Sequence, residues 1–189
     1  MYKRQISCCV GDIGTHAFNM VELVTGMKVK KLLADLNTLY SDNPMDVDAN
    51  ILARLSNGAN GTIRSSQIAT GEENNLRISV YGNKGGLKWE QENPNYLYHL
   101  TDDQPLRVLK SAHQYNSEIS NLSIKIPPGH PEGIFDSMGN IYHGVSKAIN
   151  GQSFYNEEFP GIEDGVRGMD FIEKAVHSSK SGNIWVNLD

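Results

Sequence analysis

The chain has 189 residues, with 17 Lys and Arg against 22 Asp and Glu and a formal net charge of -5. This length suits one well-cored domain and is too short for a full dinucleotide-binding domain beside a full catalytic one. The acidic balance excludes the basic stripe with which proteins neutralise nucleic-acid phosphates. No apolar run reaches membrane-spanning length, and no signal peptide is visible. We therefore expect a cytoplasmic protein with no nucleic-acid partner and no membrane partner.

The chain has two cysteines, Cys8 and Cys9, which are neighbours in the sequence. Neighbouring cysteines provide neither a disulfide framework nor a spaced set of metal ligands, and they fit a reducing compartment. Residues 1–5 show no helix or strand pattern. We expect them to be a truncated or non-native start, outside the fold.

The first predicted helix runs from Asp12 to Thr25, with Asp12 as its N-cap and Gly26 as its C-terminal stop. Asp12, His16 and Asn19 fall on one mostly polar strip beside the apolar face. A carboxylate four residues before an imidazole on a helix can fix the tautomer of the ring and raise its basicity. The spacing therefore suggests acid/base chemistry, and the plainer interpretation is a capping Asp12 with an exposed His16.

Between residues 28 and 110 the apolar residues recur at every second position, which is typical of half-buried strands. Segments rich in Gly and Asn, at 56–61 and 82–86, predict hairpin connections between antiparallel neighbours. We predict strands at 28–40, 47–56, 61–70, 76–82, 86–91, 95–101 and 105–110.

A Pro- and Gly-rich loop at 126–133 leads into a second amphipathic helix with an apolar face from Ile134 to Ile149. A third helix is predicted at 163–178 and a last strand at 183–188. Strands in one block with helices outside it predict an α+β fold, with an open, mainly antiparallel sheet and helices packed on one face.

Other residues could contribute to a site. Gly14, inside the first helical turn, suggests that something approaches the backbone there. Gln67 lies on a predicted strand of otherwise small polar residues that could form the floor of a polyol pocket, although a solvated sheet face is the simpler interpretation. His130, between Gly129 and Pro131, could point into a cleft or be an ordinary surface histidine.

The six histidines form no His-x-x-x-His pair, so a structural zinc site is not expected. A histidine-based metalloenzyme would need three ligands to converge in space. Neither a Gly-x-Gly-x-x-Gly loop nor a phosphate-binding Gly-x-x-x-x-Gly-Lys-Ser/Thr loop is present. The sequence thus predicts no metal and no dinucleotide site within the chain itself.

Three motifs, at 11–19 (Gly-Asp-Ile-Gly-Thr-His-Ala-Phe-Asn), 129–133 (Gly-His-Pro-Glu-Gly) and 163–168 (Glu-Asp-Gly-Val-Arg-Gly), occur in this order. Together they resemble the C-terminal domain of the glucose-fructose oxidoreductase, inositol dehydrogenase and rhizopine catabolism family (Gfo/Idh/MocA). The resemblance implies a substrate-binding and catalytic domain over residues 6–189, next to an N-terminal Rossmann domain that binds NAD or NADP. His16 matches the family histidine that exchanges a proton with the substrate hydroxyl, and Asp12 matches the carboxylate on the same helix. The family's Glu-Lys-Pro lysine has no counterpart here.

We therefore expect a parent NAD(P)-dependent dehydrogenase that acts on a sugar or cyclic polyol, and an inactive chain when it is alone. Asn19, Gln67 and His130 are candidate ligands of substrate hydroxyls. The resemblance also implies a homo-oligomer formed through the sheet. The alternative is a non-catalytic sheet domain for oligomerisation or ligand binding.

Overall fold

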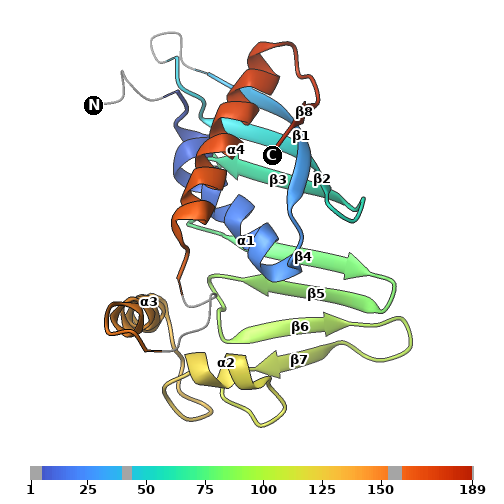
Figure 1. Cartoon of the computed structure of the whole chain (residues 1–189). Coiled ribbons are helices and arrows are strands. Elements are labelled where there is room, and N and C mark those ends of the chain that lie inside the picture. Colours follow the sequence, from blue (N-terminus) through green and yellow to red (C-terminus); the bar gives the residue numbers. More distant parts are fainter. Residues whose placement is uncertain (1–5, 40–43, 153–158, 189) are drawn as a thin grey trace. The chain divides into compact units, whose positions relative to one another are not determined.

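The computed structural model describes residues 6–39, 44–152 and 159–188. The chain divides into two compact units, unit 1 with Met1–Glu72 and Gly161–Asp189, and unit 2 with Glu73–Pro160. Each unit has one four-stranded sheet, and the strand pairs are antiparallel (Figure 1). The α+β class and the antiparallel pairing are confirmed. The predicted strands, however, are divided between two sheets.

The first helix starts earlier than the sequence pattern predicts. A π-helical turn, η2 (Val10–Gly14), precedes α1 (Thr15–Thr25), so Asp12 lies inside the helix and is not its N-cap. At the other end the prediction is confirmed, because Gly26 has a φ of 66° and donates its N–H to the carbonyl of Glu22 at 3.0 Å.

The helix start is capped by a distant residue, Asp46. One carboxylate oxygen of Asp46 accepts the N–H of Cys8 and the other accepts the N–H of Val10, both at 2.8 Å. Asp46 is buried, and its negative charge lies at the positive end of the helix dipole. This carboxylate thus takes the role that the sequence pattern assigned to Asp12.

We expect Asp46→Ala to destabilise unit 1 by about 2 kcal/mol, because the buried N–H of Val10 and the partly buried N–H of Cys8 lose their acceptor. Asp46→Asn keeps one carbonyl acceptor and should lower the free energy of unfolding by less. Urea unfolding, followed by the fluorescence of Trp185 in a Trp89→Phe background, measures both values in unit 1. The exposed Asp35→Ala is the matched control, and an Asp46→Ala loss no larger than that of this control would contradict the capping role.

The sheet of unit 1 has the strand order β3-β2-β1-β8. Residues on one face of β2 are buried and those on the other are mostly exposed, as the period of two predicted. On the buried face, α1 and α4 pack over the sheet, with Phe18 of α1 stacked on Phe171 of α4 at 4.3 Å between ring centroids (Figure 1). The elements are β1 (Val29–Asn37), β2 (Asp48–Leu55), β3 (Asn60–Ser66), α4 (Ile162–Lys180) and β8 (Val186–Asn187).

The C-terminal end of α4 also bonds to the edge of β1. The short β8 pairs only with Lys31 and Leu32 of β1. Farther along β1, the N–H of Ala34 donates to the hydroxyl of Ser178 at 2.8 Å, and the N–H of Leu36 donates to the hydroxyl of Ser179 at 3.1 Å. Serine hydroxyls thus replace a neighbouring strand along this part of the edge.

The predicted strand at 61–70 is shorter in the structure, and this separates the two sheets. β3 ends at Ser66, opposite the first residue of β2, Asp48. Beyond that point the N–H of Gln67 donates to the carbonyl of Val47 at 2.8 Å, and Gly71 has a φ of 92°. The chain therefore leaves the first sheet before the second one begins.

The sheet of unit 2 has the order β4-β5-β6-β7. The turn between its first two strands requires glycine, because a Cβ on Gly85, whose φ is 140°, would lie 2.4 Å from the carbonyl oxygen of Leu100. A short helix, α2, lies in the stretch where no element was predicted. The elements are β4 (Arg77–Gly82), β5 (Gly85–Glu90), β6 (Tyr96–Leu100), β7 (Arg107–Lys110), α2 (Glu118–Ser123) and α3 (Ile134–Ile149).

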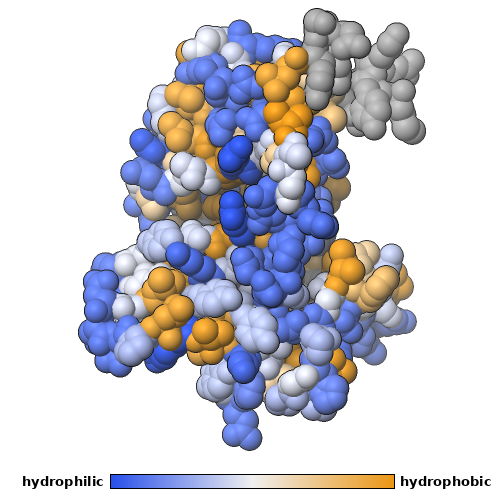
Figure 2. Space-filling view, turned by 180° about the vertical axis from the view of Figure 1, so that it is seen from behind, coloured by the Kyte–Doolittle hydropathy of each residue, from blue (hydrophilic) through white to orange (hydrophobic). Residues whose placement is uncertain are grey.

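Apolar side chains remain exposed on both units, and orange patches stand among blue polar ones in the space-filling view (Figure 2). On α3, the Phe135 side chain is 89% exposed and that of Ile149 is 79% exposed. None of the helices in the described part of the chain is both long and apolar enough to cross a bilayer.

Candidate functional site

The polar strip predicted on the first helix is an exposed surface of unit 1. Asp12, His16 and Asn19 are all exposed, whereas Gly14 and Phe18 between them are buried. The helix therefore holds its candidate acid/base groups in solvent while its opposite side is fixed in the core.

Asp12 and His16 are not joined by a hydrogen bond or an ion pair in the described residues. The Asp12 carboxylate instead accepts a long hydrogen bond, 3.4 Å, from the side-chain amide of Gln67. Asp12 lies within the π-helical turn Val10–Gly14, and Gln67 directly follows the last residue of β3, Ser66. The expected direct pairing of carboxylate and imidazole is thus absent in this structure, although both groups lie on the same exposed side of the helix.

The two cysteines also contact the end of β3. The Cys8 thiol donates to the amide oxygen of Gln67 at 3.4 Å, and the Cys9 thiol donates to the hydroxyl of Ser65 at 3.4 Å. Burial raises the pKa of the Cys9 thiol to about 11, against the smaller lowering effect of its hydrogen bond to Ser65. Cys9 therefore stays protonated at neutral pH and is a poor nucleophile.

Gly14 lies where the helix faces β3. A Cβ at this position would lie 3.4 Å from the Ser65 hydroxyl and 3.4 Å from a methyl group of Val10. The prediction that something approaches the backbone here is confirmed, and what approaches is a strand of the same unit.

The second half of α1 is held by a buried ionic network that the sequence analysis missed. Glu22 is only 8% exposed. Arg167 of α4 binds its carboxylate with two hydrogen bonds, at 2.6 Å and 2.9 Å. The Lys28 ammonium and the N–H of Val29 each donate to the same carboxylate at 2.8 Å. The network joins α1, α4 and β1, so it fixes the helix that carries His16.

Burial by itself would raise the pKa of Glu22, but the hydrogen bonds from Arg167, Lys28 and Val29 outweigh it and hold the pKa below its ordinary value. The contact to Glu22 in turn raises the pKa of Arg167. The only sequence signal for this pair was Arg167 within the third motif, Glu163 to Gly168. Its partner Glu22 could not be identified, because 145 residues separate the two.

His130 lies in unit 2, in an exposed loop. Its N–H donates to the carbonyl of Pro127 at 3.2 Å. The loop is fixed next to it, where the Asn95 side chain donates to the carbonyl of Glu132 at 2.9 Å and accepts the N–H of Glu132 at 3.1 Å. A substrate contact through His130 remains a prediction.

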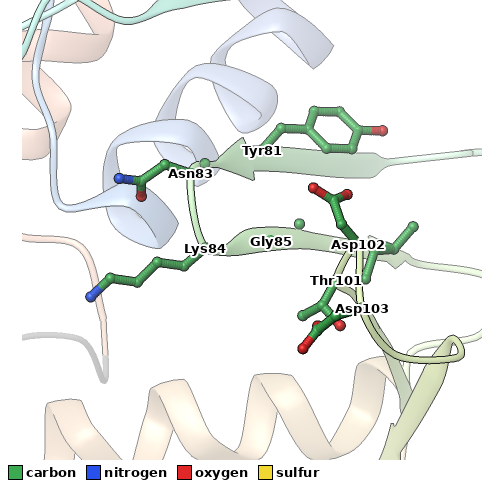
Figure 3. Close-up of a pocket in the computed structure, with 10 residues that line it drawn as sticks. Tyr81, Asn83, Lys84, Gly85, Thr101, Asp102 and Asp103 are labelled. Atoms are coloured by element: carbon green, nitrogen blue, oxygen red, sulfur yellow. The ribbon is translucent and has the colours of Figure 1, made fainter.

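A shallow hollow of about 560 Å³ lies at the turns of the second sheet and contains none of the predicted site residues (Figure 3). Asp102 lies on the side of Tyr81, while the Asp103 carboxylate points the other way and Lys84 points outward (Figure 3). No group of three His, Cys, Asp or Glu side chains in the described ranges could hold a metal ion. The exposed face of α1 is therefore the best candidate site.

Comparisons with known proteins agree with the fold. Residues 1–88 match the family model described as the GFO/IDH/MocA C-terminal domain. The uncharacterized oxidoreductase YfiI of Bacillus subtilis (strain 168) is 30% identical over 96% of this chain and 48% of its own length. The chain spans about half the length of the curated relatives it matches.

Two solved structures extend the comparison. An oxidoreductase from Sinorhizobium meliloti is 38% identical, with a TM-score of 0.88, over 94% of this chain and 51% of that one. An inositol dehydrogenase homologue from Azotobacter vinelandii, complexed with NADH and myo-inositol, is 28% identical, with a TM-score of 0.82, over 96% of this chain and 50% of that one. Residues 1–88 therefore match the GFO/IDH/MocA C-terminal domain, and the chain has the fold of the matching half of these oxidoreductases.

Proposed function

We propose that this chain is the substrate-binding and catalytic half of an NAD(P)-dependent oxidoreductase that acts on a sugar or a cyclic polyol. The observation that carries the proposal is the exposed His16 on a helix whose other side is anchored in the core. The match of residues 1–88 to the family model supports it, as does the similarity to the A. vinelandii homologue, whose structure contains NADH and myo-inositol.

The oxidation of a secondary alcohol removes a hydride from carbon and a proton from the hydroxyl oxygen. In our proposal the imidazole of His16 takes that proton, since a histidine is well suited to proton exchange near neutral pH. Asp12 supplies a negative charge on the same exposed strip of the helix. Asn19 offers a side-chain amide to a neighbouring hydroxyl, and we keep His130 as a candidate for another.

The dinucleotide does not fit the described residues. Its usual fold needs parallel strands joined through a helix, and in the described part of the chain the strand pairs are antiparallel. We therefore propose that NAD or NADP is held by another part of the parent protein, and we assign no step of the reaction to residues that would bind it.

The test joins this chain to the half of the S. meliloti oxidoreductase that it does not cover, which gives what we call the joined enzyme. We expect the joined enzyme to reduce NAD or NADP with at least one member of a panel of sugars and cyclic polyols, and the chain alone to give no turnover. A joined enzyme that is folded and binds the dinucleotide, yet turns over no member of the panel, would contradict the proposal.

Assembly through a sheet is our second proposal. Opposite residues of antiparallel strands share a face, and one face of the unit 2 sheet exposes Tyr81, Tyr96 and Val108. Exposed apolar and aromatic groups on a sheet face favour an interface between copies of the chain. A homo-oligomer of this kind is compatible with the catalytic role.

A further inference from the structure

We propose that Gln67 is a positioning residue for Asp12 and that Cys8 sets the orientation of the Gln67 amide. This inference rests on the proposed function, and it gives Gln67 a role other than substrate binding. The observation behind it is a short chain of contacts, from the Cys8 thiol through the Gln67 amide to the Asp12 carboxylate.

The two ends of the Gln67 amide match their partners chemically. A thiol donates to an oxygen, and the Cys8 sulfur lies 3.4 Å from Oε1 of Gln67. A carboxylate only accepts, and Oδ2 of Asp12 lies 3.4 Å from Nε2 of Gln67. A reversed amide would place its oxygen against the carboxylate, so the thiol and the carboxylate favour the same orientation.

Gln67 is also fixed by its backbone. Its N–H donates to the carbonyl of Val47 at 2.8 Å. Val47 follows Asp46, whose carboxylate caps the start of the same helix. The backbone that carries the amide is therefore tied to the segment that caps the helix, while the Gln67 and Asp12 side chains themselves are exposed.

This contact leaves half of the Asp12 carboxylate available. Oδ2 accepts from Gln67, and no group within the described ranges donates a hydrogen bond to Oδ1. Oδ1 can thus accept a hydrogen bond on the exposed side of the helix, where His16 lies one turn further along. Without the amide the carboxylate can rotate away, and the protonated imidazole loses a fixed counter-charge.

The first test uses kinetics of the joined enzyme. Gln67→Ala and the isosteric Gln67→Glu should lower kcat about tenfold with little change in KM, because a hydrogen bond to a charged group is lost. Cys8→Ala should lower kcat less, and Cys8→Ser, which keeps a donor, should restore it. The exposed Gln114→Glu is the matched control and should leave kcat unchanged.

The opposite kinetic pattern overturns the proposal. If the Gln67 variants raise KM and leave kcat unchanged, Gln67 binds substrate. If Cys8→Ser and Cys8→Ala have equal kcat values, the thiol does not orient the amide.

The second test needs no activity, so it separates this inference from the proposed function. In the chain alone, the carboxyl ¹³C resonance of Asp12 should move in Gln67→Ala and in Cys8→Ala and stay in place in Gln114→Glu, with backbone spectra as the check of folding. An unmoved Asp12 resonance overturns the contact chain. A moved resonance together with an inactive joined enzyme would instead contradict only the proposed function.

Discussion

His16→Ala should lower the kcat of the joined enzyme by about 10²- to 10⁴-fold, the usual loss when a positioned acid/base group is removed. The substitution is made on an exposed helical surface, and alanine favours a helix, so the fold should be kept. The measurement is the initial rate of NAD or NADP reduction with the best substrate of the panel.

Two controls make the result specific for proton transfer. Added imidazole should restore part of the lost rate in His16→Ala, because a free base can then enter the space of the missing ring. His177→Ala removes another exposed helical histidine of unit 1 and should leave kcat near the wild-type value. Full activity of His16→Ala across the panel would refute the assigned role.

Arg167→Met should destabilise unit 1 by about 3 kcal/mol, near the lower end of the loss seen when one partner of a buried ion pair is removed. The Glu22 carboxylate would stay buried and, among the residues that the structure describes, keep only Lys28 and the N–H of Val29 as donors. Lys28 compensates little, since its side chain is 49% exposed. Urea unfolding through Trp185 fluorescence in the Trp89→Phe background measures the change.

The double variant Glu22→Gln with Arg167→Met distinguishes the free-energy cost of an unpaired buried charge from the cost of lost packing. It removes the buried charge and keeps an acceptor for Val29, so it should be more stable than Arg167→Met alone. Lys174→Met, which removes a partly exposed cation 4.0 Å from Asp170, should change stability by less than 1 kcal/mol. A double variant no more stable than Arg167→Met would indicate that the guanidinium acts through packing.

The same network predicts a dependence of stability on pH. The pKa of Glu22 is lower in the folded state than its ordinary value of 4.5. Its contribution to stability is therefore complete above about pH 4.5 and is lost as the pH falls through the lower folded value. Wild type and Glu22→Gln should thus differ most near neutral pH and converge in acid.

The regular elements could be predicted from the sequence because burial imposes a period on each of them. The alternation from Val47 to Leu55 gave β2, and the apolar stripe from Ile134 to Ile149 gave α3, within about a residue. The division into two sheets could not be predicted in this way. This division depends on the residue at which β3 stops pairing with β2. The alternation of buried residues along a strand does not show which strand it pairs with.

The candidate site, like the fold, was predicted only in part from the sequence. Helical spacing identified the exposed strip with Asp12, His16 and Asn19. It could not show that Asp12 contacts Gln67, or that Asp46 caps the helix, because those partners lie 55 and 36 residues away. Residues that hold a site from a distance leave no periodic signal in the sequence.

The two serines at the end of α4 have a consequence for solubility. A strand from another molecule can add to a sheet only where N–H and C=O groups are unpaired. Since Ser178 and Ser179 occupy the N–H groups of Ala34 and Leu36, the part of β1 that extends past β8 offers no donors at these two positions to an incoming strand. The helix thus protects its own sheet from edge-to-edge aggregation, and in the described part of unit 1 the long edge left to such pairing is that of β3.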